Sequence, residues 1–153
     1  MTRLDKAVRL LICAVLAGTL LQAPARAQTT TAPFDIYAVL SLTGSGSFLG
    51  KEEAQALHGA EALFNQRGGI SGTPIHFVVQ DDTSSPTVAV QLATAIIAKH
   101  VPIMLGPTLV SACSAVAPLF KDGPVQYCFA PGVYPPPGSY SFASSVATKD
   151  FVI

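Results

Sequence analysis

The sequence carries little charge and no long apolar segment, and each shortage disfavours a class of function. Charged residues make up 12% of the 153 residues, and no block of like charge occurs. Clustered Lys and Arg are what hold a phosphate backbone, so we expect no nucleic-acid partner. The most apolar run, Leu10 to Leu21, has twelve residues, whereas a helix needs about 20 to cross a bilayer. This length disfavours a membrane anchor.

Residues that carry catalysis or bind metals are also scarce. The chain has no Gly-x-Ser-x-Gly nucleophile elbow, and no group of His, Cys, Asp and Glu has metal-ligand spacing. Its three histidines, His58, His76 and His100, are scattered. Asp81 and Asp82 could hold a cation, but carboxylates between a strand and a helix more often cap a turn. We therefore expect no enzymatic activity, no cofactor and no metal site.

A dinucleotide-binding fold is an alternative that the glycine pattern disfavours. Gly44-Ser45-Gly46 follows the first expected strand and Asp81 ends the second, as in such folds. The fingerprint requires a third glycine at position 49, which is Leu49, and Gly50 comes one residue late. The glycines are therefore expected to form a turn.

The N-terminus has the three parts of a cleavable secretory signal. The chain starts with three basic residues and one acidic residue, and the apolar run follows. Ala25-Arg26-Ala27 then provides the small residues expected beside a cleavage site. We expect residues 1–27 to be a signal peptide, with cleavage after Ala27. Cys13 lies inside the apolar run, so it is not expected to carry a lipid. The protein is therefore expected outside the cytoplasm.

Removal of the signal changes the charge and the cysteine count. The remaining residues, 28–153, hold 5 Lys and Arg against 8 Asp and Glu, a net charge of −3. Two cysteines remain, Cys113 and Cys128. In an oxidising compartment they can form a disulfide, which would close a loop of about 15 residues and contribute on the order of 3 kcal/mol. Two buried free thiols are the alternative.

Strand and helix signals alternate after a polar leader at residues 28–33. Short apolar runs predict strands, and stripes of helical period predict the helices between them. The expected strands are 36–42, 75–80, 101–105, 125–130 and 140–143, and the expected helical stripes lie within 49–64, 89–97 and 112–120. Pro102 argues against full pairing at the start of the third strand, and Pro118 should kink the last helix or delay its start.

Two of the helices can be described more closely. Ser85 can cap the second, with Pro86 at its first position. In the first helix one apolar stripe is expected to face the core. Its members are Leu49, Ala56, Ala60, Leu63 and Phe64.

The alternation predicts an α/β fold, a doubly wound parallel sheet flanked by helices. Parallel sheets bind ligands at the carboxyl ends of their strands. Functional residues are therefore expected in the loops at 43–50, 81–86, 106–111 and 131–138.

Those loops and the segments beside them resemble one family. The matching stretches are 42–50, 59–62, 65–72, 80–86, Gly106-Pro107 with 115–118, and 123–125. They are similar to the leucine/isoleucine/valine-binding type of periplasmic substrate-binding protein, which has the type I fold and serves ABC transporters. The resemblance runs over 34–146 in order. It implies two α/β lobes that close on a small molecule, an amino acid or a related organic acid, and dock on a membrane permease.

In that family three loops of the first lobe hold the ligand, and the resemblance places candidate residues in each. Leu49 lies at the aromatic position of the first loop, where neighbouring Phe48 could substitute by a shift. Leu109 and Val110 lie where the family has a pair of serines, which leaves Thr108 and Ser111 as the nearest hydroxyls. Gly132, Val133 and Tyr134 form the third loop, with Tyr134 where threonine is usual. Fewer hydroxyl partners should weaken the binding of an amino acid's polar groups, so a more apolar or aromatic acid is expected.

Members of the family are longer than this chain. Residues 34–153 are therefore expected to be an incomplete N-terminal lobe, without the second lobe and the hinge. The alternative function is the ligand-binding domain of a sensory receptor with the same fold.

Overall fold

An apolar strand lies inside the sheet and sets its direction. The computed structural model describes residues 32–144, and in it β1 (Phe34–Leu40) ends in three fully buried residues. The sheet has five strands in the order β2-β1-β3-β4-β5, and every neighbouring pair is parallel. Strands covered on both faces have near-continuous apolar sequences, which is why β1 shows no alternation of polar and apolar residues.

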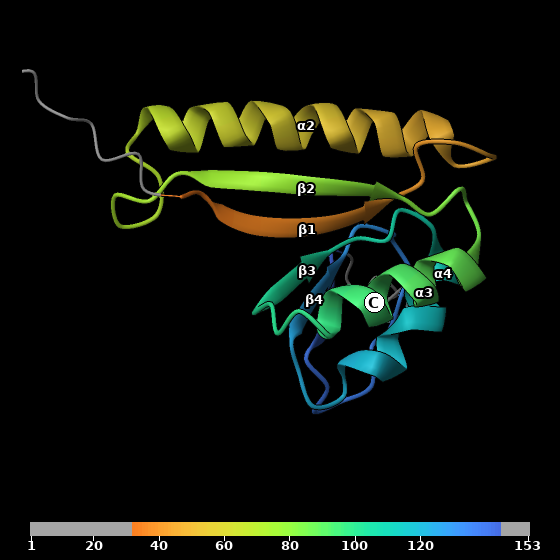
Figure 1. The fold of residues 1–153 in the computed structure, drawn as a ribbon. Helices are drawn as coiled ribbons and strands as arrows, with labels where there is room; N and C mark the ends of the chain where they lie inside the picture. The colour runs from red at the N-terminus through yellow and green to blue at the C-terminus, as the bar shows by residue number, and fades with distance from the viewer. Residues whose placement is uncertain (1–31, 145–153) are drawn as a thin grey trace, which may run out of the picture. The chain divides into compact units, whose positions relative to one another are not determined.

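The remaining elements alternate as the sequence predicts, so the expected fold class is confirmed (Figure 1). They are α2 (Ser47–Gln66), β2 (Ile75–Asp81), α3 (Pro86–Ile97), β3 (Ile103–Leu105), α4 (Val110–Val116), the 3₁₀ helix η1 (Ala117–Phe120), β4 (Val125–Cys128) and β5 (Ser141–Ala143). No helix among residues 32–144 is both long enough and apolar enough to span a membrane.

Several predicted boundaries need correction. β1 lies two residues earlier than expected, because the Leu42 amide donates to the Asp81 carboxylate at 2.9 Å and leaves the strand ladder. β4 ends at Cys128, two residues before its predicted end, and β3 begins at Ile103, two residues after its predicted start. The two proline predictions are confirmed. Strand β3 begins only after Pro102, whose carbonyl still accepts the Val125 amide, and α4 gives way to η1, which contains Pro118.

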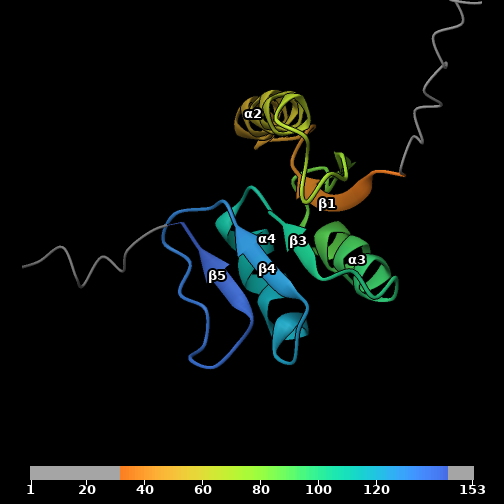
Figure 2. The same cartoon turned by 90° about the vertical axis from the view of Figure 1, so that its left-hand side faces the viewer.

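Helices lie on both faces of the sheet. α2 covers β1 and β2 on one face, while α3, α4 and η1 lie on the other (Figures 1 and 2). The Ser85 hydroxyl caps α3 and Pro86 fills its first position, as predicted. The larger core cluster lies between the strands and α3, α4 and η1, and its fully buried members are Val39, Ala89, Ala93, Ile96, Met104, Ala112, Val116 and Phe120.

The prediction of the buried face of α2 is wrong. Leu49, Leu63 and Phe64 are about half exposed, at 51%, 47% and 50%. The helix is rotated because its polar residues bind the outer edge of the sheet: Glu61 accepts the Phe77 amide at 2.7 Å, and Asn65 pairs with the Ile75 backbone. β2 is an edge strand, whose unpaired backbone groups need partners, and this requirement outweighs burial of the apolar stripe.

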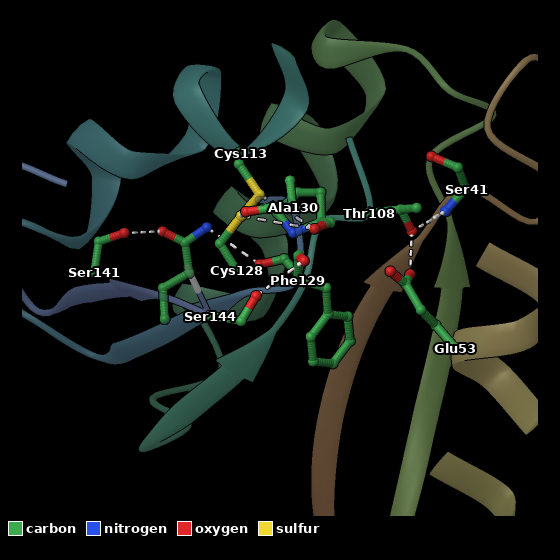
Figure 3. Close-up of a disulfide and its surroundings, with 12 residues drawn as sticks. Ser41, Glu53, Thr108, Cys113, Cys128, Phe129, Ala130, Ser141 and Ser144 are labelled. Carbon is green, nitrogen blue, oxygen red and sulfur yellow. Dashed lines mark hydrogen bonds between the residues drawn. A yellow bond between two sulfur atoms is a disulfide. The ribbon is translucent and has the colours of Figure 1, made fainter. Parts of the chain in front are cut away.

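A disulfide joins Cys113 of α4 to Cys128 of β4 (Figure 3). Of the two alternatives for these cysteines, the structure therefore has the bonded pair. Ala130 and Val133 are buried beside it and form a second, smaller core cluster. The disulfide thereby fixes the chain that follows β4 against α4.

Two glycines of α2 have opposite surroundings and allow a matched test. A Cβ on Gly50 would collide with the Ser41 carbonyl group, whereas a Cβ on Gly59 would meet nothing within 4 Å. We expect Gly50→Ala to lower the free energy of unfolding by about 1–3 kcal/mol, as overpacking does. Gly59→Ala should raise it by about 0.5–1 kcal/mol. Urea unfolding measures both, and changes of the same sign would contradict this packing.

Candidate ligand-binding edge

Because all five strands are parallel, their carboxyl ends meet at one edge of the sheet. The loops at that edge are 41–46 after β1, 82–85 after β2, 106–109 after β3 and the start of the segment 129–140 after β4. α2 and α4 begin there. This edge, which we call the carboxyl edge, is where parallel sheets bind ligands.

Ser41 connects three of the elements that meet at the carboxyl edge. Its backbone amide donates to Thr108 Oγ1 at 3.0 Å, and its hydroxyl donates to Asp82 Oδ1 at 2.7 Å. Thr108 in turn donates its hydroxyl proton to Glu53 Oε2 at 2.6 Å. Figure 3 shows Thr108 between Ser41 and Glu53. The end of β1, the loops after β2 and β3, and the second turn of α2 are thus held by one network that is buried except at Glu53, which is partly buried.

A second set of hydrogen bonds joins the loops after β1 and β2. Asp81 accepts from the backbone amides of Leu42, Thr43 and Thr83 and from the Thr43 hydroxyl. The Ser84 hydroxyl donates to the Thr43 carbonyl at 2.7 Å and accepts the Gly46 amide at 2.9 Å. The capping role expected of Asp81 is thus confirmed.

Two acidic residues of this edge have pKa values shifted from their ordinary values, in opposite directions. Burial raises the pKa of Glu53, the Thr108 hydrogen bond offsets part of that rise, and the negative charge of Asp82 raises the pKa further, so that it lies above 4.5. Burial acts to raise the pKa of Asp81 too, but its hydrogen bonds outweigh it and hold the pKa below 3.8. Asp82 is fully buried, and its Oδ2 has no hydrogen-bond partner among the described residues.

The loops after β3 and β4 are fixed by buried amide and hydroxyl groups. Gln126 donates through Nε2 to the Gly106 carbonyl at 3.2 Å and accepts at Oε1 from the Ser141 hydroxyl at 2.6 Å. The Phe129 amide donates to the Pro107 carbonyl at 3.3 Å. These bonds set the position of the backbone on which the second and third groups of candidate residues lie.

Most of the candidate ligand-binding residues are exposed near this edge. Phe48, 76% exposed, and Leu49 lie in the first turn of α2. Val110 and Ser111 begin α4. Gly132 and Tyr134 follow β4, and Tyr134 is 55% exposed. Elements distant in sequence thus present mainly apolar side chains beside the ends of β1, β3 and β4.

Three candidates are turned inward. Thr108 is buried, and its hydroxyl both accepts from Ser41 and donates to Glu53. Leu109 is partly buried against the larger core cluster. Val133 is buried beside the disulfide. Their positions favour a part in shaping the edge, and the assignment of all nine residues to ligand binding remains a prediction.

Sequence reasoning missed Ser41 and Glu53. Glu53 follows two other charged residues, Lys51 and Glu52, and nothing local distinguishes it from them. Its partner Thr108 lies 55 residues away. The one available signal is positional, because Ser41 ends the first strand and Thr108 follows the third, so a parallel sheet places them at the same edge.

The described residues have no cluster suited to a metal ion, since no three of their His, Cys, Asp and Glu side chains could hold one. His76 pairs with Asp35 at 3.1 Å, in a pair that is about half exposed. The candidate residues at the carboxyl edge are instead mainly aromatic and aliphatic side chains on loops held by hydrogen bonds.

A family model described as "Periplasmic binding protein" matches residues 35–150. The chain belongs to the periplasmic binding protein family. Members of this family bind ligands rather than catalyse reactions, which confirms the expectation of no enzymatic activity. No protein of curated function matches the sequence.

Solved structures of periplasmic binding proteins share the fold. The branched-chain amino acid transporter substrate binding protein LivJ from Streptococcus pneumoniae, in complex with isoleucine, is 22% identical with a TM-score of 0.64, over 75% of this chain and 34% of that one. A fatty acid ABC transporter substrate-binding protein from Thermomonospora curvata is 28% identical with a TM-score of 0.59, over 65% and 25%.

A third similar structure holds an aromatic ligand. It is a solute binding protein of an ABC transporter from Rhodopseudomonas palustris BisB5, in complex with 3,4-dihydroxybenzoic acid, 23% identical with a TM-score of 0.55 over 64% of this chain and 27% of that one. The present chain matches about a third or less of each structure's length.

The raised pKa of Glu53 predicts a pH dependence of stability. Above about pH 4.5 the folded chain keeps a proton that the unfolded chain releases, so stability falls as pH rises through the folded pKa. In Glu53→Gln this part of the fall should be absent, whereas Glu52→Gln, at an exposed neighbouring position, should retain it. Urea unfolding from pH 4 to pH 7 measures the difference, and identical profiles for the native chain and Glu53→Gln would refute the assignment.

Proposed function

We propose that this chain is the first lobe of an extracytoplasmic solute-binding protein of an ABC importer. The observation that carries the proposal is the exposure of large apolar side chains at the carboxyl edge in a member of a binding-protein family. Phe48, Leu49, Val110 and Tyr134 come from three separate segments at that edge. Exposed apolar groups gathered in this way are typical of an interaction site.

The ligand that we propose is a small organic acid with an apolar or aromatic body. Thr108 carries the hydroxyl of its loop that lies nearest the end of β3. This hydroxyl donates its only proton to Glu53, so it has no proton left to donate to a ligand carboxylate. Exposed side chains nearby are mostly apolar. A ligand that depends on hydroxyl donors would leave its own polar groups unpaired, which is unfavourable. The aromatic and fatty-acid ligands named for two similar structures agree with this class.

We further propose that the complete binding protein has a second lobe, and that it delivers ligand to a membrane permease. Support comes from the length of the similar structures, of which this chain covers about a third. Closure of two lobes around a ligand removes it from water and raises affinity. The single lobe should therefore bind its ligand weakly, in the millimolar range.

Titration of the mature chain, residues 28–153, with benzoate and with leucine tests the ligand class. Saturation-transfer NMR should show millimolar binding of benzoate and at least threefold weaker binding of leucine, because the exposed surface offers apolar contact and few hydroxyl donors. Val110→Asp should weaken benzoate binding at least fivefold, since it places a negative charge beside the carboxylate.

A matched control for this variant is Ile70→Asp. Ile70 is as exposed as Val110, at 51% against 46%, but it follows α2 at the opposite edge of the sheet. Ile70→Asp should leave benzoate binding unchanged. Tighter binding of leucine than of benzoate would rule out the ligand class, and equal loss in both variants would rule out the location.

Export itself can be tested by intact mass. Residues 1–27 lie outside the described residues, so the signal peptide remains a prediction. Exported protein should begin at Gln28, and it should take up no thiol-alkylating label until it is reduced and then two, because Cys113 and Cys128 are bonded. A chain that still begins at Met1 would refute the cleavage, and labelling without reduction would refute the bond.

A further inference from the structure

The disulfide joins two of the three chain segments that carry the candidate ligand-binding residues. Cys113 lies in the first turn of α4, the turn that begins with Val110. Cys128 is the last residue of β4, directly before the loop that holds Val133 and Tyr134. The bond spans a sequence separation of 15 residues and holds the two Cα atoms 6.1 Å apart. It therefore links the second and third groups of candidate residues covalently.

The loop after β3 also meets the two sulfur atoms. The Pro107 carbonyl oxygen lies 3.1 Å from Cys113 Sγ and 3.8 Å from Cys128 Sγ, and the same oxygen accepts the Phe129 amide at 3.3 Å. Both cysteines are fully buried. Figure 3 shows Ala130 and Phe129 beside the sulfur atoms. Three segments of the carboxyl edge thus converge at the disulfide.

Side-chain packing around the disulfide involves little apolar area. The core cluster there consists of the two cysteines, Ala130 and Val133, with Ala143 packed against it, whereas the larger core cluster includes Met104 and Phe120. Stabilisation by burial scales with the apolar area removed from water, so small side chains hold the loop after β4 weakly. The covalent bond therefore restrains the position of this loop more than packing does.

The restraint reaches Tyr134 through a stiff stretch of chain. Val133 is buried beside the disulfide, and Tyr134, the next residue, is 55% exposed. Pro131 and Pro135 flank this stretch, and the proline ring fixes the backbone angle φ at both places. A displacement of Val133 is thus passed on to Tyr134.

We propose that the Cys113–Cys128 disulfide is a positioning element of the ligand site, which sets the distance between Val110 on α4 and Tyr134 on the loop after β4. The inference rests on the proposed function, because that function assigns both residues to ligand binding. A ligand that touches both side chains needs them at one separation, and a preorganised pair binds more tightly than a mobile one. The affinity of the lobe for its acid therefore depends on the bond, beyond the contribution of the bond to stability.

The double variant Cys113→Ser/Cys128→Ala tests the positioning without ligand. The hydroxyl introduced at position 113 can donate to the Pro107 carbonyl, which lies 3.1 Å from Cys113 Sγ, so no buried donor is left unpaired. NMR relaxation of the mature chain, residues 28–153, should give backbone order parameters of about 0.85 for residues 132–134 in the native chain and below about 0.6 in the variant. The order parameters of β1 should be equal in both.

Titration with benzoate tests the consequence for binding. The double variant should bind benzoate at least fivefold more weakly than the native chain, as measured by saturation-transfer NMR. The matched control is Ile96→Ala, which removes buried contacts from the larger core cluster near the end of α3 and lowers stability by a comparable amount. Because α3 ends at the opposite edge of the sheet, the control should keep the native benzoate affinity and the native order of residues 132–134. Circular dichroism establishes folding.

Val133→Ala replaces the double variant if that variant does not fold. It keeps the bond but shortens the side chain packed beside it, and it should weaken benzoate binding at least twofold. Native order parameters or native benzoate affinity in the variant that folds would overturn the proposal, as would an equal loss of affinity in Ile96→Ala. A native chain that does not bind benzoate would refute the proposed function instead, and the order parameters would then decide whether the disulfide positions the loop.

Discussion

Ser41 is the residue on which the arrangement of the carboxyl edge depends. It directly follows β1 and is fully buried, and its amide and hydroxyl bind the loops that follow β3 and β2. Its carbonyl lies so close to α2 that only glycine fits at position 50. A single small polar residue therefore sets how closely two loops and one helix approach the end of the central sheet.

At the carboxyl edge, polar side chains of the network around Ser41 hold the loops together, whereas apolar side chains remain exposed. Thr108, Asp82 and Glu53 have hydroxyl or carboxylate groups that hold the loops together. The side chains left exposed are mainly apolar, among them Phe48 and Tyr134. Buried polar groups need partners, so the loops become rigid at the expense of groups that could bind a polar ligand. This division is the physical basis of the proposal that the ligand is apolar or aromatic.

Much of the fold could be predicted from the sequence because its signals are local. The order of strands and helices, the Ser85 cap and the effects of Pro102 and Pro118 depend on residues close in the chain. The rotation of α2 could not be predicted in this way. Glu61 turns the helix by binding the edge of β2, and no property of the helix alone reveals that edge.

In the candidate site, too, only the features that depend on local sequence could be predicted. Its loops could be located, because the carboxyl ends of parallel strands always share an edge. The contact of Glu53 with Thr108 could not, because it joins residues far apart in sequence whose types suggest nothing in isolation. For a related reason the sequence left two alternatives for Cys113 and Cys128, a disulfide or two free thiols. Spacing alone does not show which side chains face one another.

The central claim is that the carboxyl edge of this lobe binds a small apolar acid, and methyl NMR of the mature chain with bound benzoate tests it most directly. Intermolecular nuclear Overhauser effects should connect the benzoate ring to the methyl groups of Leu49 and Val110. They should be absent for Ile70, at the other edge of the sheet. Effects confined to Ile70 would contradict the claim.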